Sequence, residues 1–276
     1  RILRGRGGGR FAAPVDPASG RDRDAKPRIV FFGDLDGDGK AEAVTQTELP
    51  EVEGLRAGLA NARRPQTELA IHRLGPGLRM ESRPASRVPI EGWAFPGEGE
   101  FAWPGGFRDL NGDGRLDLVT LNLDFSLLQA VQVLAAKRIS IGLDFNVWCQ
   151  GSDGAFRRVS GLDLSGRFQL NLQNLRLGQL SSFAGDFDGD GRADFVQMGR
   201  GRRVTVHLGR PDCSYAQEPD QVIELAEEIA DLALVKVRDL DGDGRADLAL
   251  IRPGQRRNDG ATPPVRLDLY LSEAKP

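Results

Sequence analysis

Four copies of one acidic loop motif constrain this 276-residue chain more than any other feature. Each copy is a nine-residue window with the pattern D-x-[DN]-G-D-G-x-x-[DE]. The windows are residues 34–42, 109–117, 186–194 and 239–247. The spacing of their first acids leaves room for a unit of about four short strands in each interval, so the chain reads as a repeat protein.

The segments around each window predict β-strands. A short apolar run precedes each window and another follows it, so each window is expected to join two strands of a hairpin. Further along each unit, polar and apolar residues alternate with the period of a third strand. These third strands are expected at residues 69–72, 143–147, 204–207 and 267–271. After a Gly151–Gly154 turn signal, residues 155–159 are expected to form a fourth strand in the second unit.

These patterns predict an all-β fold, a β-propeller of four-stranded blades in which four blades carry the motif. The propeller domain is expected to span residues 28–276, with residues 1–27 as an N-terminal extension. The 35 glycines fit a fold with many tight turns. One amphipathic helix is expected at residues 127–137, inserted in the second unit. Residues 49–66 and 252–264 are expected to be loops.

The fourth unit ends after its third strand, at residues 265–271, so the ring needs one more strand to close. Residues 2–3 or 11–15 could supply it as a clasp strand beside 265–271. Completion of the ring by a strand of a partner subunit is the alternative.

The acids of each window are the residue types that hold calcium. Calcium takes six to eight oxygen ligands and tolerates irregular geometry. Acids at positions 1, 3, 5 and 9 of one short loop repel one another unless a cation neutralises them, whereas an ordinary Asp-Gly turn needs no such crowding. An EF-hand would need a glutamate at position 12 and flanking helices. Here position 12 is Thr45, Thr120, Gln197 or Leu250.

We therefore expect up to four Ca²⁺ ions, each bound by the side chains at positions 1, 3, 5 and 9 and by the backbone carbonyl at position 7. The ligands of the first two sites are Asp34, Asp36, Asp38, Lys40 and Glu42, and Asp109, Asn111, Asp113, Arg115 and Asp117. Those of the last two are Asp186, Asp188, Asp190, Arg192 and Asp194, and Asp239, Asp241, Asp243, Arg245 and Asp247. Asn111 leaves the second site with one carboxylate fewer, so this site is expected to empty first when calcium is removed.

The four windows resemble the FG-GAP or VCBS repeats of integrin α-chain-like β-propellers. The resemblance is close within the windows and looser over residues 28–276. It implies that each loop lies on a strand–strand hairpin of one blade and holds Ca²⁺ through the positions named above. The sequence departs from that pattern at Glu42 and Asn111, and it has four motifs where integrins have seven blades.

No catalytic motif accompanies the repeats. The two histidines, His72 and His207, occupy equivalent places in third strands, which indicates a structural role. We expect a non-catalytic interaction or structural scaffold that is secreted, at the cell surface or periplasmic, with a protein partner or a larger complex. The alternatives are a calcium-dependent hydrolase or lyase acting on polysaccharide or phospholipid, which needs paired carboxylates such as Asp163 or Glu224 in a cleft, and a lectin.

The remaining features concern partners and the cysteines. A lectin would use the aromatic residues Trp93, Phe95, Phe101 and Trp103, for which packing within the fold is the other interpretation. The net charge of −3 argues against nucleic acid as a partner. The sequence has no run of about 20 apolar residues, so direct insertion in a membrane is not expected. The two cysteines, Cys149 and Cys213, could form a disulfide or remain free thiols.

Overall fold

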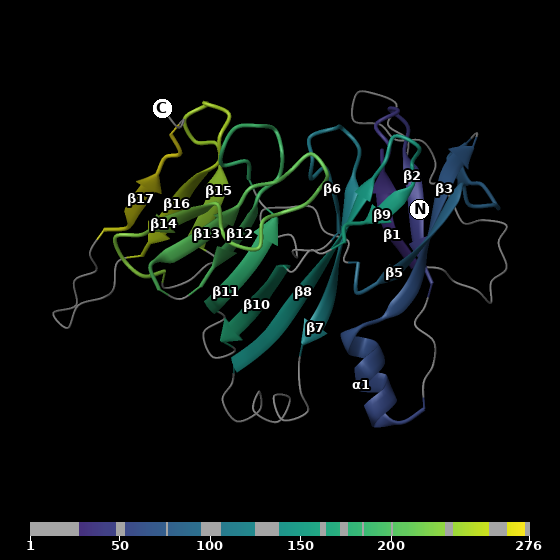
Figure 1. Cartoon of the computed structure of the whole chain (residues 1–276), viewed down its shortest axis with the longest axis horizontal. Coiled ribbons are helices and arrows are strands. Elements are labelled where there is room, and N and C mark those ends of the chain that lie inside the picture. Colours follow the sequence, from purple (N-terminus) through teal and green to yellow (C-terminus); the bar gives the residue numbers. More distant parts are fainter. Residues whose placement is uncertain are drawn as a thin grey trace.

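The computed structural model describes residues 28–47, 53–75, 77–94, 106–124, 138–160, 164–171, 176–183, 185–199, 201–229, 234–253 and 264–273. These residues form a mostly β structure of three antiparallel sheets with one helix, and none of the three sheets is closed. The N-terminal strands lie at one end of the molecule and the C-terminal strands at the other (Figure 1).

Each acidic window lies between the first two strands of an antiparallel meander, which we call a unit. Unit 1 contains β1 (Arg28–Gly33), β2 (Glu42–Gln46), β3 (Gln66–Gly75) and β5 (Ser86–Glu91), with β4 (Arg79–Met80) paired to the end of β3. Unit 2 contains β6 (Gly106–Arg108), β7 (Asp117–Asp124), β8 (Arg138–Gln150) and β9 (Phe156–Arg158). Unit 3 contains β11 (Arg176–Phe183), β12 (Phe195–Met198), β13 (Arg203–His207) and β14 (Gln221–Glu224). Unit 4 contains β15 (Val235–Arg238), β16 (Asp247–Arg252) and β17 (Arg266–Tyr270).

The predicted hairpins and third strands are confirmed, and so is the fourth strand of unit 2. Among the strands that the sequence did not locate, one changes the architecture. β10 (Leu164–Asn171) pairs with β8 on one side and with β11 on the other, so units 2 and 3 share one continuous nine-stranded sheet. Separate propeller blades are therefore not shown.

The second and third strands pair in an equivalent register in all four units, whereas the first strand of unit 3 is shifted by one residue relative to that of the other units. Counting from the first acid of each window, the residue at position 10 pairs with the first strand, as in Phe107↔Leu118 and Phe183↔Phe195. Position 11 pairs with the third strand, as in Val196↔Val206 and Ala249↔Leu269. Equivalent positions of different units can therefore be compared directly.

The core lies between the units. One apolar cluster joins unit 1 to Leu118 of unit 2, a second joins unit 2 to Phe183 and Phe195 of unit 3, and a third joins unit 3 to Leu248 and Leu250 of unit 4. Each unit thus buries its apolar residues mainly against the next unit, as expected for a repeat protein.

One of the segments expected to be a loop contains a helix. Residues 49–66 are not loop throughout, because α1 (Leu55–Arg63) forms within them. Alanine, leucine and arginine favour a helix here despite Gly58, and the Trp93 indole donates a hydrogen bond to the carbonyl of Ala62 near its C-terminal end (2.8 Å). The helix predicted at 127–137 and the clasp predicted from residues 1–27 lie outside the described residues. Among the described strands, β17 pairs only with β16.

Candidate metal centre

The position-1 aspartate closes each loop. In the first loop Asp34 accepts hydrogen bonds from the backbone N–H of Gly37 and of Gly39, both at 2.9 Å. The other three loops repeat both bonds. The glycines at positions 4 and 6 all have φ between 75° and 85°, a conformation that side chains disfavour. The sequence pattern therefore wraps the backbone around the carboxylate at position 1.

The position-9 acid ties the loop to the sheet. Asp117 is fully buried and accepts hydrogen bonds from the N–H of Leu110 (2.9 Å) and from that of Gln150, at the end of β8 (2.8 Å). Asp194 and Asp247 repeat this arrangement, whereas Glu42 makes only the first of the two bonds. Burial, with smaller contributions from the neighbouring loop carboxylates, raises the pKa of Asp117 and of Asp194 to about 6.

The position-5 acids lie on the outer side of the loops. Each forms an ion pair with the basic side chain at position 7, as in Asp38–Lys40 (2.9 Å) and Asp243–Arg245 (2.9 Å). Asp113–Arg115 and Asp190–Arg192 are paired in the same way. Of the predicted ligands, the position-5 carboxylates are therefore the ones that already have a cationic partner.

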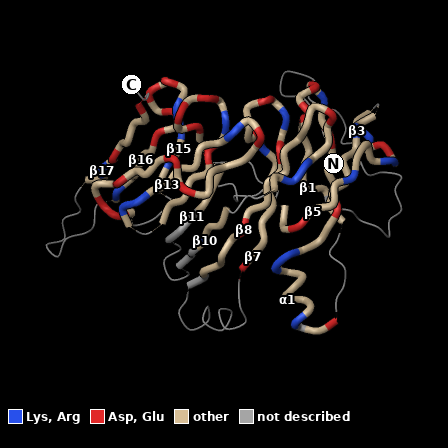
Figure 2. Tube along the Cα trace, viewed as in Figure 1, with Lys and Arg blue, Asp and Glu red and all other residues tan. Residues whose placement is uncertain are grey.

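Positions 1, 3 and 9 come together in three of the loops. One carboxylate oxygen from each of the three acids lies within 4.8 Å of the others in these groups: Asp34, Asp36 and Glu42; Asp186, Asp188 and Asp194; Asp239, Asp241 and Asp247. All four loops lie toward the upper edge of the molecule in Figure 2, where acidic segments gather. Such convergent oxygens are what a hard divalent cation requires.

The third loop provides an observation in favour of a cation. Asp188 Oδ1 is buried and accepts no hydrogen bond. Burial, and then the charge of Asp186, raise the pKa of Asp188. Burial and the neighbouring carboxylates likewise raise the pKa of Glu42. A buried acceptor without a donor is costly, and a bound cation would satisfy it. The residues of this loop therefore fit Ca²⁺.

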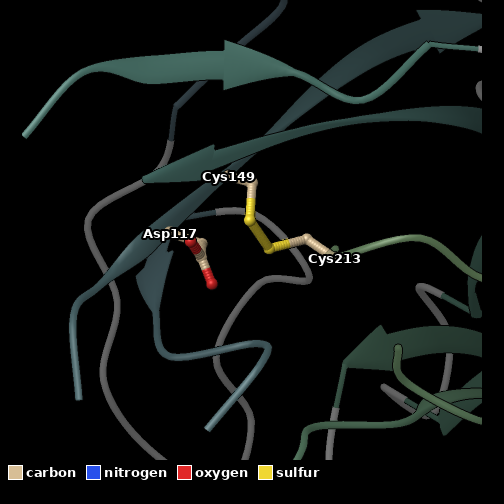
Figure 3. A group of neighbouring side chains, drawn as sticks. All are labelled: Asp117, Cys149 and Cys213. Atoms are coloured by element: carbon tan, nitrogen blue, oxygen red, sulfur yellow. A yellow bond between two sulfur atoms is a disulfide. The ribbon is translucent and has the colours of Figure 1, made fainter. Parts of the chain in front are cut away.

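The second loop is built differently. Asn111 stands at position 3, so this loop brings no third carboxylate to Asp109 and Asp117. Instead Asp117 lies beside the Cys149–Cys213 disulfide (Figure 3), with a carboxylate oxygen within 4.8 Å of both sulfur atoms. The disulfide (S–S 2.04 Å) settles the alternative that the sequence left open, and it links the end of β8 in unit 2 to the turn after β13 in unit 3.

Sequence reasoning missed that the loops contact one another in chain order. The position-8 N–H of each later loop donates to a carbonyl of the loop before it: Leu116 to Leu35 (2.9 Å), Ala193 to Leu110 (3.0 Å) and Ala246 to Asp186 (2.6 Å). The apolar residues at position 2, Leu35, Leu110 and Phe187, are at most 2% exposed. The signal in the sequence is that positions 2 and 8 are apolar in every window, although neither can bind a metal.

Other predicted features are placed as follows. His72 and His207 pair with position 10 of their units, and Nδ1 of each lies within hydrogen-bond distance of a backbone carbonyl nine residues further on. Trp93 packs beside unit 2 through a bridge to Leu121, while Phe95, Phe101 and Trp103 lie outside the described residues. So does Asp163, and Glu224 is exposed on β14.

Comparison with protein families identifies part of this arrangement. Residues 186–250 match the FG-GAP-like repeat. The matched FG-GAP-like segment runs from the first acid of the third loop to β16 and so contains both C-terminal loops. No curated protein matches the chain. Among the described residues, no helix is long and apolar enough to cross a membrane.

Proposed function

We propose that the four acidic loops bind Ca²⁺ and that the chain is a calcium-stabilised, non-catalytic scaffold for protein interactions, built as an FG-GAP/VCBS-type β-propeller. The observation that carries the proposal is the convergence of three acids in each of three loops, with an unsatisfied buried oxygen on Asp188. Calcium would neutralise these carboxylates and stabilise the loops through which consecutive units contact one another.

The propeller part of the proposal rests on the meanders. Four units with equivalent pairing of their second and third strands carry the motif between their first two strands, and consecutive units pack their apolar residues against each other. The FG-GAP-like match over residues 186–250 supports this interpretation for units 3 and 4.

The proposed location is outside the cytoplasm, as a secreted, cell-surface or periplasmic protein, with a protein partner or a larger complex. The disulfide supports this proposal because disulfides persist mainly in oxidising compartments. A net charge of −3 offers no basis for a nucleic-acid partner.

A hydrolase or lyase needs two carboxylates in one cleft. One pocket of about 400 Å³ lies beside β13 and is lined by Arg203, Thr205, His207 and Glu218 among other residues. Glu218 is the one carboxylate in this lining, so the pocket does not favour that alternative.

Calcium titration of the chelator-treated chain by calorimetry tests the proposal. We expect saturable binding of up to four ions. Asp188→Ala should weaken or abolish binding at the third loop, because it removes the unsatisfied oxygen. The matched control is Asp153→Ala, since Asp153 lies outside the loops and pairs with Arg157 at the surface. Binding that is absent, or that responds equally to both substitutions, would contradict the proposal.

A further inference from the structure

Asn111 connects the second loop to a turn of unit 3. Its Nδ2 donates hydrogen bonds to Asp113 Oδ2 within the loop (3.0 Å) and to the carbonyl of Pro211 (3.2 Å), and it lies 3.7 Å from Sγ of Cys149. Its Oδ1 accepts the N–H of Asp113 within the loop (3.2 Å). An aspartate at this position has no hydrogen to donate and would set an oxygen against the Pro211 carbonyl. The asparagine is therefore suited to the turn as well as to the loop.

The disulfide fixes the position of this turn. Cys213 is fully buried, and its N–H donates to the carbonyl of Arg210 (2.9 Å), so the turn is closed around the cysteine. At the other end of the disulfide, Cys149 precedes Gln150, whose N–H holds Asp117 (2.8 Å). The two bridged segments thus contact both the position-3 and the position-9 ligand of the second loop, and no other loop in the described part of the chain has such a link.

We infer that the Cys149–Cys213 disulfide positions the ligands of the second calcium site, and that disulfide formation and calcium binding at this site are coupled. The inference rests on the proposed calcium function. With the disulfide intact, the Pro211 carbonyl adds a second acceptor to the bond with Asp113 and so fixes the Asn111 amide with Oδ1 toward the loop. Without it, the turn is held to unit 2 by weaker contacts, and the second loop must order its ligands when calcium binds.

The coupling has to be reciprocal. Reduction by a thiol such as glutathione breaks the S–S bond, and each sulfur gains one electron and one proton, while two glutathione molecules give up the same electrons and protons and join in a disulfide. If the disulfide strengthens calcium binding by some factor, calcium must favour the disulfide over the dithiol by that same factor. A coupling of about 5- to 150-fold is typical of linked sites.

The first test compares calcium titrations of the oxidised chain, the Cys149→Ser/Cys213→Ser chain and Asp109→Asn. The binding step that Asp109→Asn weakens or abolishes belongs to the second loop. We expect the serine variant to weaken that step by about 5-fold or more while the other steps change by less than about twofold. The unaffected steps are the internal control, since general loss of structure would weaken all of them. An unchanged second step, or equal weakening of every step, would overturn the inference.

The second test does not require the serine variant to fold. The oxidised chain is equilibrated in glutathione buffers with calcium or with chelator, and the disulfide fraction is measured by alkylation and mass spectrometry. We expect calcium to make the disulfide harder to reduce, and Asp109→Asn to diminish this protection. If calcium does not shift the glutathione ratio at which half of the disulfide is reduced, the inference is overturned while the proposed function still stands. Failure of the oxidised chain to bind any calcium would overturn the proposed function as well.

Discussion

Units 3 and 4 carry equivalent residues in very different surroundings. Val204 and Val206 on β13 are fully buried, whereas Leu267 and Leu269, at the same register positions of β17, are 55% and 52% exposed. At position 2 of the loops, Phe187 is 2% exposed and Leu240 is 37% exposed. The difference is that unit 4 packs on unit 3, while no described unit packs on the outer side of unit 4. Burial in this fold is therefore supplied by the following unit rather than by the strand's own sequence.

The largest expected effect comes from the same leucine-to-alanine substitution at position 2 of an internal loop and of the loop in unit 4. Leu110→Ala removes a fully buried side chain between units 2 and 3 and should cost about 2–5 kcal/mol of unfolding free energy. Leu240→Ala changes the same residue type at the same loop position, but the side chain is partly exposed, so about 1 kcal/mol or less is expected. Urea unfolding of both variants measures the difference. Equal losses would show that the outer side of unit 4 is as well packed as the internal junctions.

A second pair of substitutions tests the contact between loops. Gly112 and Gly242 both stand at position 4 with positive φ (75° and 85°), so alanine is strained at each. A methyl group at Gly112 would also lie 2.7 Å from the Gly191 carbonyl oxygen of the next loop. A methyl group at Gly242 would have no such neighbouring atom within 4 Å among the described residues. Gly112→Ala should therefore cost about 1–3 kcal/mol more than Gly242→Ala. The same urea series measures this, and equal costs would argue against close packing of loops 2 and 3.

How much of this could be read from the sequence depends on the range of the contacts. Hairpins and third strands follow from local patterns, such as alternation along residues 204–207, and were predicted correctly where the structure describes them. The ligand positions also follow from a local pattern, and they stay a prediction. Leu110 and Leu240 look identical in sequence, so the difference in their burial could not be predicted. The disulfide pairs residues 64 positions apart and needed the structure as well. The propeller was predicted from the repeat pattern together with the family resemblance and stays a proposal, and β10, which merges two units, has no signal in the motif.

The smallest expected effect concerns the basic residue at position 7. Arg245 donates from Nε to the Asp188 carbonyl of the preceding loop (3.2 Å) as well as pairing with Asp243. Lys40 in the first loop pairs only with the exposed Asp38 among the described residues. Arg245→Met should cost about 1 kcal/mol of unfolding free energy, and Lys40→Met should cost less, because its ion pair is exposed to solvent. Thermal unfolding of both variants in calcium checks this order, and a larger loss for Lys40→Met would contradict it.

The most direct test of the account is thermal unfolding of the whole chain with calcium and with excess chelator. Each site filled at one hundred times its Kd stabilises the folded state by about 2.7 kcal/mol, and each kcal/mol raises Tm by about 2–4 °C in a chain of roughly this size. We therefore predict that calcium raises Tm by at least about 5 °C, with the shift growing as calcium concentration increases. An identical Tm in chelator, with the protein shown by elemental analysis to be free of metal, would contradict the claim that these loops are calcium sites.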